Sequence, residues 1–197
     1  MLEVWLVRHG ETDWNLEQRV QGWLDIPLNA NGRRQAEALS YQLQGIPFRA
    51  LYSSDLTRAL TTARILAKNV PLPVRTSPEL RERGLGEAEG LLRVEAERRY
   101  PNGAPSRETE EQMQRRLISM MDRIVSEVNH GRVLCVSHGG FIRLWLGYIG
   151  HPIPALGNTS VSRVAHTEGQ WRVICADCQE HLMHLGSGND TRAASPR

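Results

Sequence analysis

The stretch LEVWLV at residues 2–7 is the feature that most restricts what this chain can fold into. Its side chains are almost all apolar and do not alternate with polar ones. A continuous apolar run of this kind is typical of a strand that is buried on both faces, as in a parallel sheet covered by helices. The rest of the chain must therefore supply further strands and helices to cover both faces.

Segments with helical periodicity alternate with short apolar runs along the rest of the chain. Helices are expected within residues 29–45, 55–69, 109–128 and 141–150, and strands within residues 49–54, near Val74 and within residues 132–138. Asp55 is the expected N-cap of the second helix, and Thr109 with Gln112 has the pattern of a capping box. Strands alternating with helices predict an α/β fold of three layers, α/β/α, around a mainly parallel central sheet with right-handed crossovers.

The C-terminal part has a different pattern. The runs SVSRVAH and QWRVICA, separated by TEG, predict a hairpin. This hairpin can add to the edge of the sheet or to a second copy of the chain, so a homodimer stays open. Residues 84–106 predict a loop, a short helix and a Pro/Gly turn. We expect residues 1–185 to form one domain and the polar residues 186–197 to be a flexible tail.

Composition points to an ordinary globular protein. Of the 197 residues, 40% are hydrophobic and 23% charged, and the net charge is +2. This charge does not point to nucleic acid, and we expect no such partner. No apolar stretch approaches the ~18 residues that cross a membrane, and no secretory signal follows Met1, so we expect a cytoplasmic protein without a membrane partner. Cys175 and Cys178 lack a second Cys or His pair at zinc spacing, which favours reduced thiols and no metal.

Two of the expected strands end in the same chemistry. The first ends in LVRHG at residues 6–10 and the later one in CVSHG at residues 135–139, and a third strand leads into a helix that begins near Arg58. In open α/β sheets, ligands bind beyond the carboxyl ends of the strands. Glycine at such a turn lets backbone N–H groups approach an anion closely. The pattern therefore predicts an anion site formed by arginines and histidines.

These segments resemble the histidine phosphatase superfamily, which includes cofactor-dependent phosphoglycerate mutases and many phosphatases. The resemblance covers roughly residues 2–165 and is carried by the ordered blocks RHGETDWN, SSDLTRALTTA, LRERGLGEAEG and VSHGG. Arg-His-Gly alone is a weak signal, whereas these blocks in order are a strong one. The resemblance implies a phosphoglycerate mutase-like fold and a reaction without metal or other cofactor.

The resemblance also implies roles for particular residues. His9 would be the nucleophile that takes the phosphoryl group onto a ring nitrogen, and Glu82 would protonate the leaving oxygen and later activate water. The resemblance implies that Arg8, Arg58 and His138 surround the phosphoryl oxygens. Asn15 and the Gly139 N–H would complete this site, and Gln21 and Gly22 would contact the substrate.

These residue types suit the chemistry. A phosphomonoester carries about two negative charges, and the transferring group spreads charge over three oxygens. Two guanidinium groups and an imidazole can stabilise that charge where another enzyme would use a metal ion. A neutral imidazole is a capable nucleophile near pH 7, and one carboxyl group can serve as acid and then as base.

Simpler structural roles compete with these assignments. Arg8 can pair with Glu11, and Arg58 can be a solvated helix residue beside an aspartate. Glu82 can form a salt bridge with either neighbouring arginine. Three other glutamates are rivals for the role of the acid: Glu79, Glu87 and Glu89.

The remaining question is hydrolysis or phosphoryl transfer between hydroxyls. The family's mutases have a longer insertion after the acid, whereas 23 residues separate Glu82 from Ser106 here, and Gln21 stands where the mutases have a hydroxyl residue. Both features favour a phosphatase that acts on a small phosphomonoester, similar to the broad-specificity and alpha-ribazole phosphatases. A mutase is the alternative, and a non-catalytic phospho-ligand binding module is a weaker one. Trp14 and Trp23 either favour a substrate with an apolar body or belong to the core.

Overall fold

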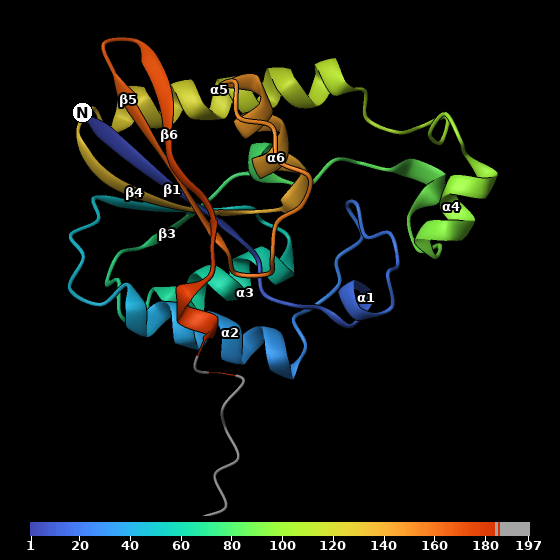
Figure 1. Ribbon diagram of the computed structural model, residues 1–197, viewed down its shortest axis with the longest axis horizontal. Helices are drawn as coiled ribbons and strands as arrows, with labels where there is room; N and C mark the ends of the chain where they lie inside the picture. Colours follow the sequence, from blue (N-terminus) through green and yellow to red (C-terminus); the bar gives the residue numbers. More distant parts are fainter. Residues whose placement is uncertain (184, 186–197) are drawn as a thin grey trace, which may run out of the picture.

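The computed structural model describes residues 1–183 and 185, and the predicted tail at residues 186–197 lies outside the described residues (Figure 1). Six strands form one sheet in the order β3-β2-β4-β1-β5-β6. Their bounds are Leu2–Arg8 for β1, Ala50–Ser53 for β2, Val74–Thr76 for β3, Gly131–Ser137 for β4, Val161–Thr167 for β5 and Gln170–Cys178 for β6.

The sheet is mainly parallel, as the sequence predicts. Strands β3, β2, β4 and β1 run in the same direction, while β5 is antiparallel to β1 and β6 is antiparallel to β5. The terminal hairpin therefore extends the sheet of its own chain on the far side of β1, which is one of the two arrangements the sequence left open.

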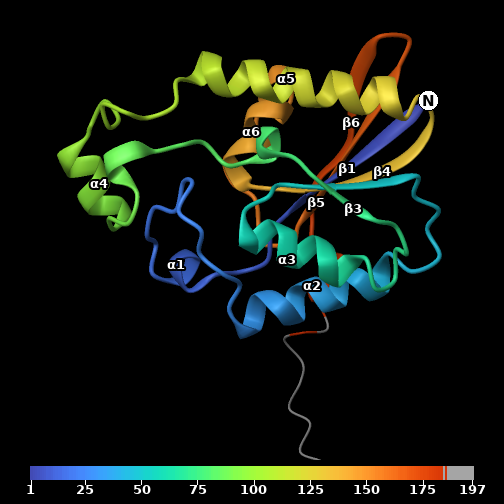
Figure 2. The same ribbon diagram turned by 180° about the vertical axis from the view of Figure 1, so that it is seen from behind.

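Helices lie on both faces of the sheet (Figures 1 and 2). The long helices are α2 (Ala30–Gln42), α3 (Thr57–Leu66), α5 (Glu110–Glu127) and α6 (Gly139–Tyr148), and the short ones are α1 (Asp13–Leu16), α4 (Arg93–Arg99) and the 3-10 turns Pro78–Leu80, Gly86–Ala88 and Glu180–Leu182. Helices α5 and α6 cover one face, and α2 and α3 cover the other. The predicted three-layer fold is thus confirmed.

Strand β1 explains why both faces must be covered. Leu2, Val4 and Leu6 belong to the core shared with α5 and α6. Val7 points the other way, into the core shared with α2 and α3. Successive side chains of a strand alternate between faces, so an apolar run buries both. The same alternation directs the next residue, Arg8, towards α6.

The predicted helix starts are right in one case and wrong in the other. Thr109 and Gln112 form the expected capping box at the start of α5. Asp55 does not cap α3, because the N-cap is Leu56 and makes no side-chain cap bond. The carboxylate of Asp55 instead accepts hydrogen bonds of 2.8 and 2.5 Å from Arg81. This ion pair lowers the pKa of Asp55 and ties the start of α3 to the segment that carries Glu82.

The segment at residues 84–106 contains the expected short helix, α4, beside the Gly86–Ala88 turn. Figure 1 shows α4 and α1 projecting to one side of the sheet. Within residues 1–183 and 185, no helix has both the length and the apolar character needed to cross a membrane.

Candidate active site

The carboxyl ends of β1 and β4 bring the two histidines together. These strands pair in parallel with Arg8 opposite Ser137, and the backbone N–H of His9 donates to the Ser137 carbonyl over 3.0 Å. His9 and His138 therefore follow neighbouring strands at the same edge of the sheet. Their ring centroids lie 5.1 Å apart.

The hydrogen bond of His9 fixes its tautomer. Nδ1 lies 2.7 Å from the carbonyl oxygen of Gly10. A carbonyl can only accept, so Nδ1 carries the proton and Nε2 keeps its lone pair. Burial, reinforced by the charges of Arg58 and Arg8, lowers the pKa of His9 well below its usual value. His9 is thus a buried imidazole whose neutral form is favoured and whose Nε2 lone pair is free to act as a nucleophile.

His138 lies fully buried beside His9. Its Nε2 is 2.8 Å from Oγ of Ser54, which also accepts a hydrogen bond from the Leu56 N–H. The Ser54 hydroxyl can therefore donate to Nε2, in the tautomer that places the His138 proton on Nδ1. Burial, followed by the charge of Arg58, lowers the pKa of His138 well below its usual value.

Two guanidinium groups lie near His9, that of Arg58 buried and that of Arg8 partly buried. Arg58, in the first turn of α3, is 1% exposed and donates to the carbonyls of Leu24 and Gly22, both over 2.8 Å. Burial lowers the pKa of Arg58 to about 10, which leaves it charged at neutral pH. Arg8 donates through Nη1 to the Leu156 carbonyl. In both arginines Nε is buried without a hydrogen-bond partner among the described residues.

The simpler roles considered for these arginines are wrong. Arg58 is not solvated. Arg8 does not pair with Glu11, whose carboxylate instead accepts hydrogen bonds from Asn29 and Asn31. One buried and one partly buried cation are therefore bonded to backbone carbonyls and not to carboxylates, an arrangement that is costly without a bound anion.

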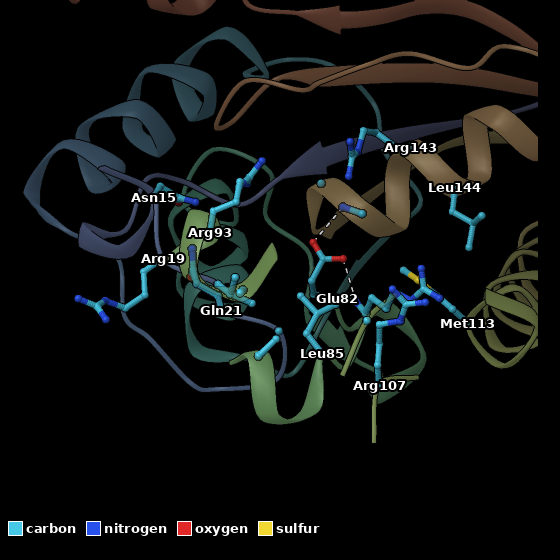
Figure 3. A pocket seen from close by; sticks show the side chains of 18 of the residues that line it. Asn15, Arg19, Gln21, Glu82, Leu85, Arg93, Arg107, Met113, Arg143 and Leu144 are labelled. Atoms are coloured by element: carbon cyan, nitrogen blue, oxygen red, sulfur yellow. Dashed lines mark hydrogen bonds between the residues drawn. The ribbon is translucent and has the colours of Figure 1, made fainter. Parts of the chain in front are cut away.

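Glu82 lines the same cavity as this cluster, and its carboxyl group points towards the start of α6 (Figure 3). Its Oε1 accepts a 2.8 Å hydrogen bond from the Arg83 N–H, and its Oε2 accepts a 2.9 Å bond from the Gly140 N–H at the start of α6. Its backbone carbonyl accepts from Trp23 Nε1 and Arg116 Nη2. Two backbone donors and two side chains thus fix the position of the carboxyl group.

The salt bridge considered for Glu82 is not formed in the described residues. Its neighbours have other partners: Arg81 pairs with Asp55, and Nε of Arg83 donates to the Glu108 carbonyl. The three rival glutamates do not line the described cavity and are engaged elsewhere: Glu79 with Arg123, Glu87 with the Ser106 N–H, and Glu89 with the N–H groups of Trp23 and Leu85.

A cavity of about 700 Å³ opens at this edge of the sheet. Eight of the nine predicted site residues line it: Arg8, His9, Asn15, Gln21, Gly22, Arg58, Glu82 and Gly139. The ninth, His138, is fully buried next to His9. Gly22 has a φ of +51°, and a Cβ there would lie 2.0 Å from the Glu89 carboxylate, so this turn requires glycine.

Further arginines line the outer part of the cavity, and all of them except Arg83 lie outside the sequence motifs. These arginines come from separate segments: Arg19, Arg83, Arg93, Arg107 and Arg143. Figure 3 labels all of them except Arg83. Two acidic side chains other than Glu82, Glu97 and Glu110, share this lining. The outer cavity is therefore strongly cationic.

The two tryptophans do not form the wall of this cavity. Trp23 supports Glu82 from outside through its hydrogen bond, and the guanidinium of Arg81 lies 5.7 Å from its ring. Trp14 stacks with Arg19 at 5.6 Å. Sequence patterns alone could not distinguish this supporting role from direct contact with a substrate.

Comparison with known sequences identifies related proteins. The sequence profile of the histidine phosphatase superfamily (branch 1) matches residues 4–178. The chain is 36% identical over 188 residues to the "Uncharacterized phosphatase PhoE" of Bacillus subtilis, covering 92% of this chain and 97% of that protein. It is 35% identical over 189 residues to the "Probable phosphoglycerate mutase GpmB" of Proteus mirabilis, covering 87% of this chain and 88% of that protein.

Solved structures share the fold. A mycobacterial glucosyl-3-phosphoglycerate phosphatase, solved with VO3, superimposes with a TM-score of 0.82 at 27% identity, covering 89% of this chain and 99% of that chain. A provisional alpha-ribazole-5'-P phosphatase from Escherichia coli gives a TM-score of 0.81 at 26% identity, covering 91% of this chain and 98% of that chain.

Proposed function

The chain belongs to the histidine phosphatase superfamily, and from this premise we propose that it hydrolyses small phosphomonoesters through a phosphate group carried on His9. One observation supports the proposal: Nδ1 of His9 is hydrogen-bonded to the Gly10 carbonyl, which leaves Nε2 free in a cavity that the guanidinium groups of Arg8 and Arg58 also line. A neutral nitrogen nucleophile next to fixed positive charge suits attack on a phosphate dianion.

The first step transfers the phosphoryl group to the enzyme. Nε2 of His9 forms a bond to phosphorus as the bond between phosphorus and the leaving oxygen breaks. Glu82 enters this step protonated and gives its proton to that oxygen, so the substrate leaves as an alcohol. Arg8 and Arg58 stabilise the charge on the transferring group.

The second step returns the enzyme to its starting state. Glu82, now a carboxylate, takes a proton from water, and the resulting hydroxide attacks phosphorus. The bond to Nε2 of His9 breaks, inorganic phosphate leaves, and both His9 and Glu82 regain their original protonation. We assign Asn15, His138 and the Gly139 N–H to binding of the phosphoryl oxygens, and Gln21 and Gly22 to contacts with the substrate.

The outer arginines support a narrower substrate class. A substrate body that reaches Arg93, Arg107 or Arg143 gains from a second anionic group, such as a carboxylate. We therefore propose small phosphorylated metabolites with additional negative charge as substrates. The three free cysteines favour a reducing compartment, and we assign the enzyme to the cytoplasm. The proposed reaction requires no nucleic acid, membrane or second copy of the chain.

A labelling experiment tests the proposal. The protein is mixed with a phosphomonoester labelled with radioactive phosphate and quenched, and the expected product is a protein-bound label that is acid-labile and alkali-stable. His9→Ala should abolish both the label and hydrolysis, whereas His130→Ala, at an exposed histidine, should retain them. Native hydrolysis by His9→Ala would overturn the assignment. A parallel assay of phosphoryl transfer to a second hydroxyl identifies a mutase if transfer is fast and hydrolysis negligible.

A further inference from the structure

The loop at residues 156–160, which leads into β5, contacts the site from behind. The Leu156 carbonyl accepts the hydrogen bond of Arg8. The Thr159 N–H donates to the backbone carbonyl of His9 over 3.3 Å. The side chain of Asn158 lies between these contacts. This loop, which carries none of the motif residues, thus touches both residues at the end of β1.

The amide of Asn158 links two site residues. Its Nδ2 donates to the His9 carbonyl over 3.1 Å and to Oδ1 of Asn15 over 3.2 Å. One NH2 group has two hydrogens, so these two bonds use its full donor capacity. Asn158 therefore sets the position of Asn15, which lies in the short helix α1, relative to the segment that carries the proposed nucleophile.

The hydrogen bonds of Asn15 also determine which end of its amide faces the cavity. Oδ1 accepts from the Thr12 N–H over 3.1 Å, from the Thr12 hydroxyl over 3.2 Å and from Asn158. Three donors identify this atom as the oxygen. The NH2 group of Asn15 is then left for the cavity that this residue lines (Figure 3). An NH2 group is the end that can donate to a phosphoryl oxygen.

The loop is itself anchored by the end of β6. Oδ1 of Asp177 accepts a 2.8 Å hydrogen bond from the Gly157 N–H, and Nε2 of His181 lies 2.8 Å from the Thr159 hydroxyl. Thr159 is fully buried with a φ of +56°, a conformation that a β-branched residue adopts only when its surroundings impose it. The position of Asn158 is therefore fixed before any substrate binds.

We propose that Asn158 is a positioning residue, which holds Asn15 at the correct distance from His9 to donate a hydrogen bond to the phosphoryl group. This inference rests on the proposed function, because it assumes that His9 receives that group. Asn158 acts through Asn15 and the His9 backbone and does not itself line the described cavity. Its loss should weaken binding of phosphate as well as turnover.

A double-mutant cycle tests this role. We expect Asn15→Ala to lower kcat/KM for p-nitrophenyl phosphate about 100-fold and Asn158→Ala to lower it about tenfold. Because Asn158 acts through Asn15, the double variant should lose clearly less than the product of the two single losses. The inhibition constant of inorganic phosphate should rise in both single variants. Losses that multiply, or an unchanged inhibition constant in Asn158→Ala, would overturn the proposal.

Controls separate positioning from stability. Asn69→Ala removes a 3.1 Å side-chain hydrogen bond to Ser40 away from the cavity, and it should lower Tm without changing phosphate inhibition. Asn158→Asp keeps the size of the side chain but cannot donate to either acceptor, so it should show the same loss if Asn158→Ala fails to fold. If Asn158→Ala keeps the native kcat/KM and phosphate inhibition while His9→Ala is inactive, only this inference is refuted. An active His9→Ala would refute the proposed function.

Discussion

The N–H of Gly140 donates a 2.9 Å hydrogen bond to Oε2 of Glu82 and so joins the first turn of α6 to the carboxyl group of Glu82. The bond is possible only because position 140 has no side chain. A Cβ there would lie 2.1 Å from Oε1 of Glu82. The geometry of the proposed acid therefore depends on a glycine that follows the second His-Gly motif.

Gly140→Ala should inactivate the enzyme without unfolding it. The new methyl group meets the end of a flexible side chain, so Glu82 can move away at small cost to the fold. We expect kcat to fall about 100-fold, within the range for a displaced general acid. Gly147→Ala is the matched control in the same helix, because a Cβ there meets no atom within 4 Å. The control should keep its kcat and gain up to about 1 kcal/mol of stability; similar activity losses in both variants would contradict this prediction.

Glu82→Gln should show a dependence on the leaving group. A glutamine cannot supply a proton, so hydrolysis of alkyl phosphomonoesters should fall about 10²- to 10⁴-fold. p-Nitrophenyl phosphate releases a stable anion that needs no proton, and its conversion to phosphohistidine should fall much less. Single-turnover measurements of both substrates check this difference. An equal loss for the two substrates would exclude Glu82 as the proton donor.

Arg107→Ala should change substrate preference. This variant removes a cationic group from the outer cavity, and KM for a phosphomonoester that carries a carboxylate should rise about tenfold. KM for a phosphomonoester without a second charge should change little. Arg115→Ala, at a position on α5 whose side chain is 77% exposed, is the control for loss of one positive charge. If both variants change KM equally, long-range charge and not contact explains the effect.

The buried histidines should make the fold sensitive to acid. Burial lowers the pKa of His181 to about 4, whereas a histidine in the unfolded chain titrates near 6.5. Below about pH 6.5 the unfolded chain then binds more protons than the folded one. The free energy of unfolding therefore decreases as the pH is lowered, by up to about 1.4 kcal/mol per pH unit for this residue. His9 and His138, whose pKa values are also lowered, add to this slope.

Urea unfolding at several pH values between 7 and 5 measures this slope. His181→Gln should reduce the loss of stability over that range, because glutamine does not bind a proton in the unfolded chain as histidine does. An identical pH dependence in His181→Gln and the native protein would show that His181 already binds a proton in the fold.

Short-range patterns predicted the elements well, because their causes are local. The apolar run before Arg8 predicted a strand buried on both faces, and Thr109 with Gln112 predicted a helix start. Asp55 failed as an N-cap because Arg81, which is distant in sequence, offers its carboxylate a charged partner. A local pattern cannot weigh such a competitor.

The site was predicted only as far as its motifs extend. His9, Arg58 and Glu82 lie in the segments that carry the resemblance to the family, and the fold brings them to one cavity. Arg143 and Asn158 lie in no such motif, and their relation to the cavity depends on how α6 and the following loop pass the end of β1. These relations arise from tertiary structure, which spacing along the chain does not encode.

The order of the strands has a consequence for synthesis on the ribosome. β1 is made first but lies between β4 and β5, so neither of its edges is paired before residue 131 has been added. The loop behind His9 is anchored by residues 177 and 181, which are made later still. A nascent chain or an early termination product therefore carries the proposed nucleophile but not the pocket around it. The complete site can therefore form only when nearly the whole described chain has been translated.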